Sequence, residues 1–407
     1  MFKGQASKEQ RNCNVTLSTN YPVGPSLAEQ SHRNKNGLRN LYSKTDIPLL
    51  RELDPITLDP IRSIEYTDLV PDAEGRMAAS HPAVDPDTGE VFNFTLRFGR
   101  TPTYVLFKLI PPTETAPASH QVLATITDAP AAYIHSVCLT KKYFIFCVWQ
   151  ADFKLNGATI PYNRNLTQSF KSWDPKRQTL WYVIGREEGG VVRRFNSEAF
   201  YAFHHINSYD EGDNVIVDLA TYDTHEVVNS FYLDVLRSST ATKPSDAKAY
   251  ITRVTLPKIS SSKELGTATL ATTKCPIELP TISPLYSLKP NQYAFGVSTR
   301  DLSSLWDCVV KVDLDVLHAN PDDPEKAIQR FERPKCTPSE PIFVPRPGAK
   351  REDDGVILMV ELDGVKANST LVVIDGISFK EIARAEVEGA KLVVPHGFHG
   401  TWWGNKL

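Results

Sequence analysis

The 407-residue sequence has no long apolar segment. Its longest strongly apolar run, YFIFCVW at 143–149, is far shorter than the roughly 20 residues that a transmembrane helix needs. The N-terminal stretch MFKGQASKEQRNCNV is polar and lacks the apolar core of a signal peptide. We therefore expect an intracellular, cytoplasmic protein without a transmembrane segment.

The sequence also has little net charge and no closely paired cysteines. The formal net charge is -3, and no block of Lys and Arg is present that would follow a phosphate backbone, so we expect no nucleic-acid partner. The six cysteines stand apart without any CxxC spacing, which argues against a zinc knuckle or a disulfide framework. We interpret them as small apolar residues of the core.

From about residue 90 onward the sequence contains a long series of short β-branched and aromatic runs. Examples are VFNFTLRFG (91–99), YFIFCVWQADF (143–153), NVIVDLATY (214–222) and GVILMVELD (355–363). Turn signals such as REEGG (186–190) and DEGDN (210–214) lie between such runs and predict tight antiparallel connections. Two helical patterns, at 229–239 and near 325, do not alternate with the strands, which argues against a doubly wound α/β fold.

A chain with so many short strands must protect their edges. It can close a barrel or repeat four-stranded blades around an axis. We predict an all-β propeller with a few short helices and loops, although no blade repeat such as a WD dipeptide is visible.

Four of the ten histidines have distinctive surroundings at the ends of predicted strands. They are His81 in SHPAVDPDTGE, His135 in YIHSVCLTKKYFIF, His204 in FHHINSYDEG and His399 in PHGFHGTWW. Taken alone, a strand histidine is more often a hydrogen-bonded core or surface residue than a metal ligand. The four lie on different predicted strands, which suits a site assembled on the axis of a propeller rather than in a local loop.

The neighbours His204 and His205 pose a choice. Successive side chains of a strand point to opposite faces, so His204 lies with Ala202 and Ile206, and His205 lies with Phe203 and Asn207. Only one of the two histidines can face a common centre.

In combination, these motifs resemble the carotenoid cleavage oxygenase family, which includes carotenoid and apocarotenoid dioxygenases, stilbene-cleaving dioxygenases and the retinoid isomerohydrolase. Matching stretches run from NLYSKTDIPLLRELDPITLDP (40–60) to the C-terminal FHG, over roughly nine-tenths of the chain. The resemblance implies a seven-bladed propeller, divided here into a variable N-terminal segment 1–35 and a single propeller domain 36–407. Family members carry a longer segment before the stretch that matches Asp46, so either the chain is a truncated gene product or the propeller is incomplete at its N-terminus.

The resemblance also implies one bound Fe(II) ion, with the ligands His81, His135, His204 and His399. In the family pattern F-H-x-x-N-x-Y-E the ligand directly follows the Phe, which selects His204 over His205. In the same way, the final FHG selects His399 over His396. Four neutral imidazoles suit a borderline metal and leave positions open for dioxygen and substrate.

Three carboxylates match the family residues that orient such ligands: Asp46 in KTDIPLL, Glu278 in IELPTI and Glu340 in PSEPIFVP. Outside this motif context, each would be interpreted as a solvated turn charge. Asp46 stands where family members commonly carry Glu. Because its side chain is one methylene shorter, we expect its hydrogen bond to an imidazole, that of His135, to be longer or bridged by water.

The activity implied by the resemblance is oxidative cleavage of a C=C double bond in a carotenoid or apocarotenoid by Fe(II) and O2, with peripheral contact to the membrane that dissolves the polyene. Stilbene-cleaving relatives carry Lys immediately before the carboxylate that matches Asp46. Here that residue is Thr45, with Lys44 one place earlier and on the opposite face, which favours a carotenoid over a stilbene. Two further alternatives stay open: a truncated, non-catalytic relative that binds metal or an apolar ligand, and isomerohydrolase chemistry on the same site.

Overall fold

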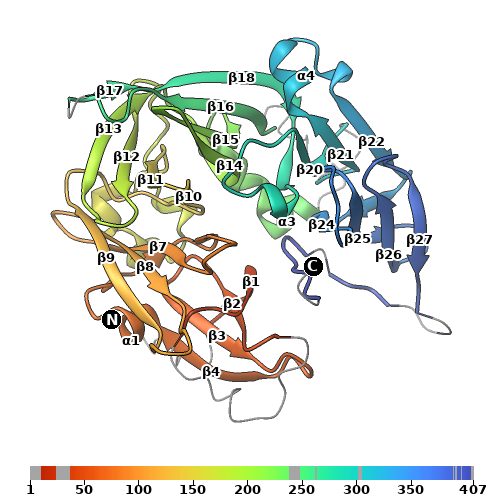
Figure 1. The fold of residues 1–407 in the computed structure, drawn as a ribbon, viewed down its shortest axis with the longest axis horizontal. Coiled ribbons are helices and arrows are strands. Elements are labelled where there is room, and N and C mark those ends of the chain that lie inside the picture. Colours follow the sequence, from red (N-terminus) through yellow and green to blue (C-terminus); the bar gives the residue numbers. More distant parts are fainter. Residues whose placement is uncertain are drawn as a thin grey trace.

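The computed structural model describes residues 11–23, 37–237, 248–261, 264–300, 305–387, 389, 392–395 and 397–404. In this part of the chain the strands form six separate sheets of four or five strands. The sheets follow one another around a common centre (Figure 1). This confirms the predicted all-β propeller. The prediction of seven blades was wrong, because the strands β1 to β27 divide among six sheets and leave none for a seventh among the described residues.

The first three sheets contain the N-terminal half of the chain and one short strand from its C-terminal half. The first sheet has the order β1 (Thr16–Thr19), β2 (Leu41–Lys44), β3 (Leu49–Leu53), β4 (Pro60–Glu65). In the second, β5 (Met77–Ala78) and β6 (Ala83–Val84) both pair with β7 (Val91–Arg97), followed by β8 (Thr103–Ile110) and β9 (Ser119–Ile126). The third consists of β10 (Cys138–Leu139), β11 (Tyr143–Val148), β12 (Thr179–Gly185), β13 (Val191–Ser197) and the parallel β17 (Gly266–Thr267).

The other three sheets follow in chain order. The fourth has the order β14 (Tyr201–Glu211), β15 (Asn214–Tyr222), β16 (Tyr250–Leu256), β18 (Thr269–Pro276). The fifth has the order β19 (Glu278–Thr281), β20 (Tyr293–Ser298), β21 (Cys308–Asp313), β22 (Ile328–Glu332). In the sixth, β23 (Cys336–Pro338) and β24 (Ile342–Pro345) pair with β25 (Gly355–Asp363), followed by β26 (Asn368–Asp375) and β27 (Glu381–Ala385).

The helices of the described residues are short. They are α1 (Tyr66–Leu69), η2 (Lys154–Gly157), α2 (Ile160–Asn163), η3 (Thr167–Ser169), η4 (His225–Phe231), α3 (Leu233–Arg237), η5 (Pro284–Tyr286), α4 (Leu314–Ala319) and η6 (Pro324–Lys326). The helix predicted at 229–239 corresponds to η4 and α3, and its last two residues lie outside the described residues. The one predicted near 325 is η6. None of these helices has the length and apolar character that a membrane span requires.

Tight turns connect the strands where glycine was predicted to allow them. Gly212 in the DEGDN turn has a φ of 62° and joins β14 to β15, and Gly189 and Gly190 in REEGG have φ of 74° and 79° between β12 and β13. These angles lie in the region that glycine adopts without steric cost. The predicted antiparallel hairpins are therefore confirmed at both sites.

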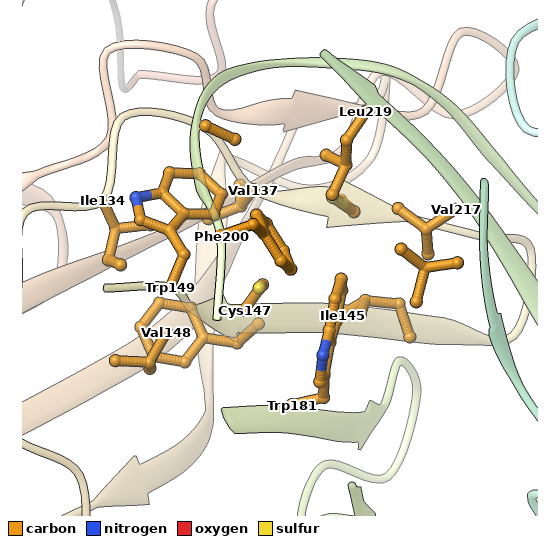
Figure 2. Close-up of a cluster of buried hydrophobic side chains, with 14 of the residues drawn as sticks. Ile134, Val137, Ile145, Cys147, Val148, Trp149, Trp181, Phe200, Val217 and Leu219 are labelled. Atoms are coloured by element: carbon orange, nitrogen blue, oxygen red, sulfur yellow. The ribbon is translucent and has the colours of Figure 1, made fainter. Parts of the chain in front are cut away.

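Apolar side chains from neighbouring sheets form the largest core cluster. Figure 2 shows part of it, where Trp149 and Trp181 lie among aliphatic residues of the third and fourth sheets. Both indoles are fully buried, and both N–H groups are satisfied: that of Trp149 by the carbonyl oxygen of Tyr133 and that of Trp181 by Ser197 Oγ, each at 3.0 Å. All six cysteines are free and buried, as predicted.

Candidate metal centre

Four imidazoles meet at the centre of the propeller. His81 precedes β6, His135 precedes β10, His204 lies in β14, and His399 belongs to the C-terminal segment that returns toward the centre (Figure 1). Their ligand-capable nitrogens all lie within 4.8 Å of one another. His81 Nε2 and His399 Nε2 are 3.1 Å apart. The structure thus brings together the four histidines singled out in the sequence.

The local shape of β14 decides between the neighbouring histidines. Its register to β15 shifts on both sides of His205, so the strand does not alternate strictly. His204 faces the other imidazoles, whereas His205 Nε2 lies 3.1 Å from Ser208 Oγ. Phe203, expected on the opposite face, packs its ring 5.6 Å from that of His135 because of this irregularity. His396 lies outside the described residues.

Three of the imidazoles are held by the three carboxylates singled out in the sequence. The Nδ1 atoms lie 2.7 Å, 2.5 Å and 3.0 Å from the carboxylate oxygens in the pairs His135–Asp46, His204–Glu278 and His399–Glu340. A carboxylate accepts a hydrogen bond, so Nδ1 carries the proton in each pair and Nε2 keeps its lone pair. Within the described part of the chain, no carboxylate is hydrogen-bonded to His81.

The expectation of a long or water-bridged bond at Asp46 was wrong. Asp46 reaches His135 directly, and the Tyr133 hydroxyl lies 3.0 Å from Asp46 Oδ2 and 2.9 Å from His135 Nδ1. Tyr133 donates to the free carboxylate oxygen and so fixes the short side chain beside the ring. Sequence reasoning missed this tyrosine, although it stands two residues before His135 and therefore points to the same side of an extended segment.

Glu278 has a comparable set of partners. Its Oε1 accepts from the Tyr222 hydroxyl at 2.7 Å, and its Oε2 accepts from the Leu279 N–H at 2.7 Å. Burial would raise the pKa of Glu278, but its interaction with His204 and these hydrogen bonds hold the pKa below the usual value. Glu278 therefore stays charged and keeps the proton of His204 on Nδ1.

The donor set fits a metal ion. His204 Nε2 is buried and has no hydrogen-bond partner. Burial, followed by the neighbouring imidazoles, lowers the pKa of His81 well below 6.5, and burial lowers that of His399 as well. Neutral imidazoles whose lone pairs converge without a proton donor repel one another, and a cation among them removes this repulsion. Four nitrogen ligands suit a borderline metal such as Fe(II).

Two cavities lie near this centre. One of about 270 Å³ is lined by His81, His204 and His399. A larger one, of about 1640 Å³, is lined by residues that include Ile47 and Pro48, which follow Asp46 in the sequence. None of the four histidines lines it. We assign the chemistry to the histidines rather than to the larger cavity, because the histidines supply the groups that could bind a metal ion.

The comparisons with known proteins agree with this architecture. The family model for the retinal pigment epithelial membrane protein matches residues 2–404. The chain belongs to this family, the carotenoid cleavage oxygenases. A carotenoid dioxygenase of Neurospora crassa is 33% identical over 98% of this chain and 71% of its own length. A torulene dioxygenase of Gibberella fujikuroi is 33% identical over 96% of this chain and 71% of its own length.

Solved structures of the family share the fold. A single-residue mutant of the Synechocystis apocarotenoid oxygenase superposes with a TM-score of 0.71 at 22% identity, covering 90% of this chain and 72% of that one. A cobalt-substituted form of the same oxygenase superposes with a TM-score of 0.70 at 21% identity, with the same coverage. At this identity the likeness establishes the propeller fold.

Proposed function

We propose that this family member is a non-haem Fe(II)-dependent dioxygenase that cleaves a C=C double bond of a carotenoid or apocarotenoid with O2 to give two carbonyl products. The observation that supports it is the convergence of four imidazoles, three of them fixed by carboxylates. The relatives named carotenoid dioxygenase and torulene dioxygenase support the same substrate class.

The protein's own groups position and protect the metal ligands. Bound Fe(II) would supply the redox chemistry with O2. Asp46, Glu278 and Glu340 each hold a proton on the Nδ1 of one imidazole, which leaves its Nε2 free for the metal. No side chain needs to act as a general acid or base, because C=C cleavage by O2 moves no proton from the polyene.

A row of aromatic rings, Phe203, Phe231, Phe398 and Trp306, leads away from the imidazoles. Phe203 lies 5.6 Å from the ring of His135, and the successive centroid distances along the row are 6.0, 6.1 and 6.1 Å. Such a row offers an apolar, rigid surface for a conjugated chain. We assign it to binding the polyene with one double bond beside the metal.

Peripheral membrane contact and a cytoplasmic location are part of the same proposal, as is a single propeller domain, whose first sheet includes β1 (Thr16–Thr19) from the segment 1–35. Leu155 of η2 is 77% exposed and Tyr162 of α2 is 90% exposed. Exposed apolar side chains on neighbouring short helices are suited to insert into a lipid surface. Sedimentation with phosphatidylcholine vesicles should decrease in the double variant Leu155→Ser, Tyr162→Ser.

Anaerobic titration with Fe(II), followed by aerobic incubation with apocarotenoid and stilbene substrates in detergent, tests the function. We expect one iron per chain and aldehyde products from the apocarotenoid. Both should be lost in His204→Ala and retained in the control His120→Ala, since His120 is exposed on β9. Folded protein that binds no iron would refute the site, and iron binding without turnover of any substrate would favour the non-catalytic relative.

A further inference from the structure

The cavity of about 270 Å³ beside the imidazoles has a distinctive wall. It includes residues that directly follow the metal-site histidines along the chain: Pro82, Ala83, Ser136, Val137, His205 and Ile206. Tyr133 and Phe203, which precede their histidines, are not part of this wall. The segments at His81 and Ser136 are paired in parallel. The cavity therefore adjoins the residues that follow the histidines, and no ring of the aromatic row lines it.

A loop after β19, residues 284–291, contributes to this wall and is here called the axial loop. It is held by one side chain of β14, Asn207, which is 2% exposed. Asn207 Nδ2 donates to the carbonyl oxygens of Tyr286 (3.2 Å) and Lys289 (2.8 Å). Asn291 Oδ1 lies 2.7 Å from the same Nδ2, so the two N–H bonds of Asn207 are shared among three acceptors, and Asn207 Oδ1 accepts from the Leu288 N–H at 3.1 Å. Both polar atoms of the Asn207 amide group thus form hydrogen bonds with this loop.

Two leucines of the wall adopt backbone angles that bulky residues rarely accept. Leu279 has a φ of 45° and Leu288 a φ of 62°. The N–H of Leu279 is held by Glu278 and that of Leu288 by Asn207. Such strained residues persist where their surroundings fix them, and they gather at functional sites.

Asn207 connects the same two parts of the chain that the metal site connects. Strand β14 contains both His204 and Asn207, while Glu278 opens β19 and the axial loop follows that strand. The hydrogen bond between His204 and Glu278 joins β14 to β19, and the hydrogen bond between Asn207 and Leu288 joins β14 to the axial loop. We propose that Asn207 is a positioning residue: it clamps the axial loop to β14, which fixes the cavity wall behind the metal and the alignment of His204 with Glu278.

The accessibility of His205, which belongs to the wall, tests this clamp without metal or substrate. Diethyl pyrocarbonate acylates neutral imidazoles, and mass spectrometry gives the rate at each histidine. In Asn207→Ala we expect the rate at His205 to rise about 10-fold, because losing these hydrogen bonds favours locally open states. Asn207→Asp should have a similar effect, since its carboxylate still accepts from the Leu288 N–H but has no N–H donors for Tyr286 and Lys289.

Two controls separate local opening from loss of the fold. Asn40→Ala removes a buried amide directly before β2 that bonds the main chain of Tyr21, so it should lower stability without raising the rate at His205. His225, buried elsewhere, should keep its rate in every variant. If Asn207→Ala does not fold, Asn207→Asp decides. An unchanged rate at His205 in the folded variants, or an equal rise at His225, would overturn the clamp.

Titration with Co²⁺, followed by visible absorption, tests the effect on His204. We expect Asn207→Ala to weaken Co²⁺ binding about 10-fold, as changes behind metal ligands commonly do, and to alter the absorption bands. Asn40→Ala should bind Co²⁺ like the parent protein. Identical affinity and spectra for Asn207→Ala would refute its positioning role, and they would leave the dioxygenase proposal standing, because that proposal rests on catalysis by the Fe(II) protein.

Discussion

Asp46 accepts a hydrogen bond from His135 at 2.7 Å in a chain whose family commonly carries the longer Glu at this position. The Tyr133 hydroxyl completes the arrangement, because it bonds the second oxygen of Asp46 and lies 2.9 Å from the same imidazole nitrogen. Three side chains thus form a closed hydrogen-bonded triangle. Glu would reach the imidazole through its additional methylene. The shorter Asp46 side chain is instead held beside the imidazole by the hydrogen bond from Tyr133.

Removal of the Tyr133 hydroxyl should therefore weaken the metal site. In Tyr133→Phe, one oxygen of Asp46 loses its donor, and we expect Fe(II) affinity to fall about 10-fold in an anaerobic titration. Tyr143→Phe is the matched control, since Tyr143 is only partly buried at the start of β11. Equal affinities for the two variants would show that the triangle has no influence on the ligand.

Much of the fold was predictable, and the unpredicted parts have physical reasons. Strands from residue 90 onward are rich in β-branched and aromatic residues, and the glycine turns mark their ends. The first sheet lacks that signal because its buried positions include charged groups. Glu52 is fully buried and bonds Tyr42 and Arg62, and Lys44 is 4% exposed. Strands with paired charges in their interior do not show the apolar pattern by which strands are recognised.

The candidate metal site was likewise predictable only in part. The four histidines and three carboxylates could be found because each lies in a short motif of the family. Tyr222 could not, because its contact with Glu278 joins strands of different sheets and no local spacing encodes it. The irregularity of β14 that places Phe203 beside His135 also depends on its pairing with β15. The number of blades depends on which strands pair in the same sheet. The order of predicted strands along the sequence does not determine this pairing.

Acid should destabilise the metal-free protein through two histidines outside the cluster of four, the buried His225 and the partly buried His318. Burial lowers the pKa of His225 and of His318 below 6.5. Below pH 6.5 the unfolded chain then binds more protons than the folded one, so the free energy of unfolding falls as the pH drops toward the lowered pKa values. Urea unfolding between pH 7 and pH 5 measures this slope. His318→Leu should make it shallower, and an identical slope would contradict the assignment.

The pair Lys311 and Asp353 should control the stability of the last two sheets. Both side chains are almost fully buried, and Lys311 Nζ donates to Asp353 at 2.7 Å and to the Gly376 carbonyl at 2.8 Å. Lys311→Met leaves a buried carboxylate with less compensation, so we expect a loss of about 3 kcal/mol in the free energy of unfolding by urea. The double variant with Asp353→Asn should recover about 1 kcal/mol or more. A double variant no more stable than the single one would contradict this explanation.

Thr45→Lys should change the choice of substrate. Stilbene-cleaving relatives carry Lys at this place, where it contacts a phenolic oxygen, and Thr45 directly precedes Asp46 here. Lys44 cannot replace it, because Lys44 is buried in the first sheet, its Nζ donates to Ser18 Oγ at 2.6 Å, and burial lowers its pKa to about 7.

A charge-assisted hydrogen bond contributes about 1.5–3 kcal/mol, so the ratio of stilbene to apocarotenoid cleavage should rise about 10-fold or more in Thr45→Lys. Product ratios from mixed substrates measure it. Lys44→Met should leave the ratio unchanged, and an unchanged ratio in Thr45→Lys would remove the argument that residue 45 discriminates against stilbenes.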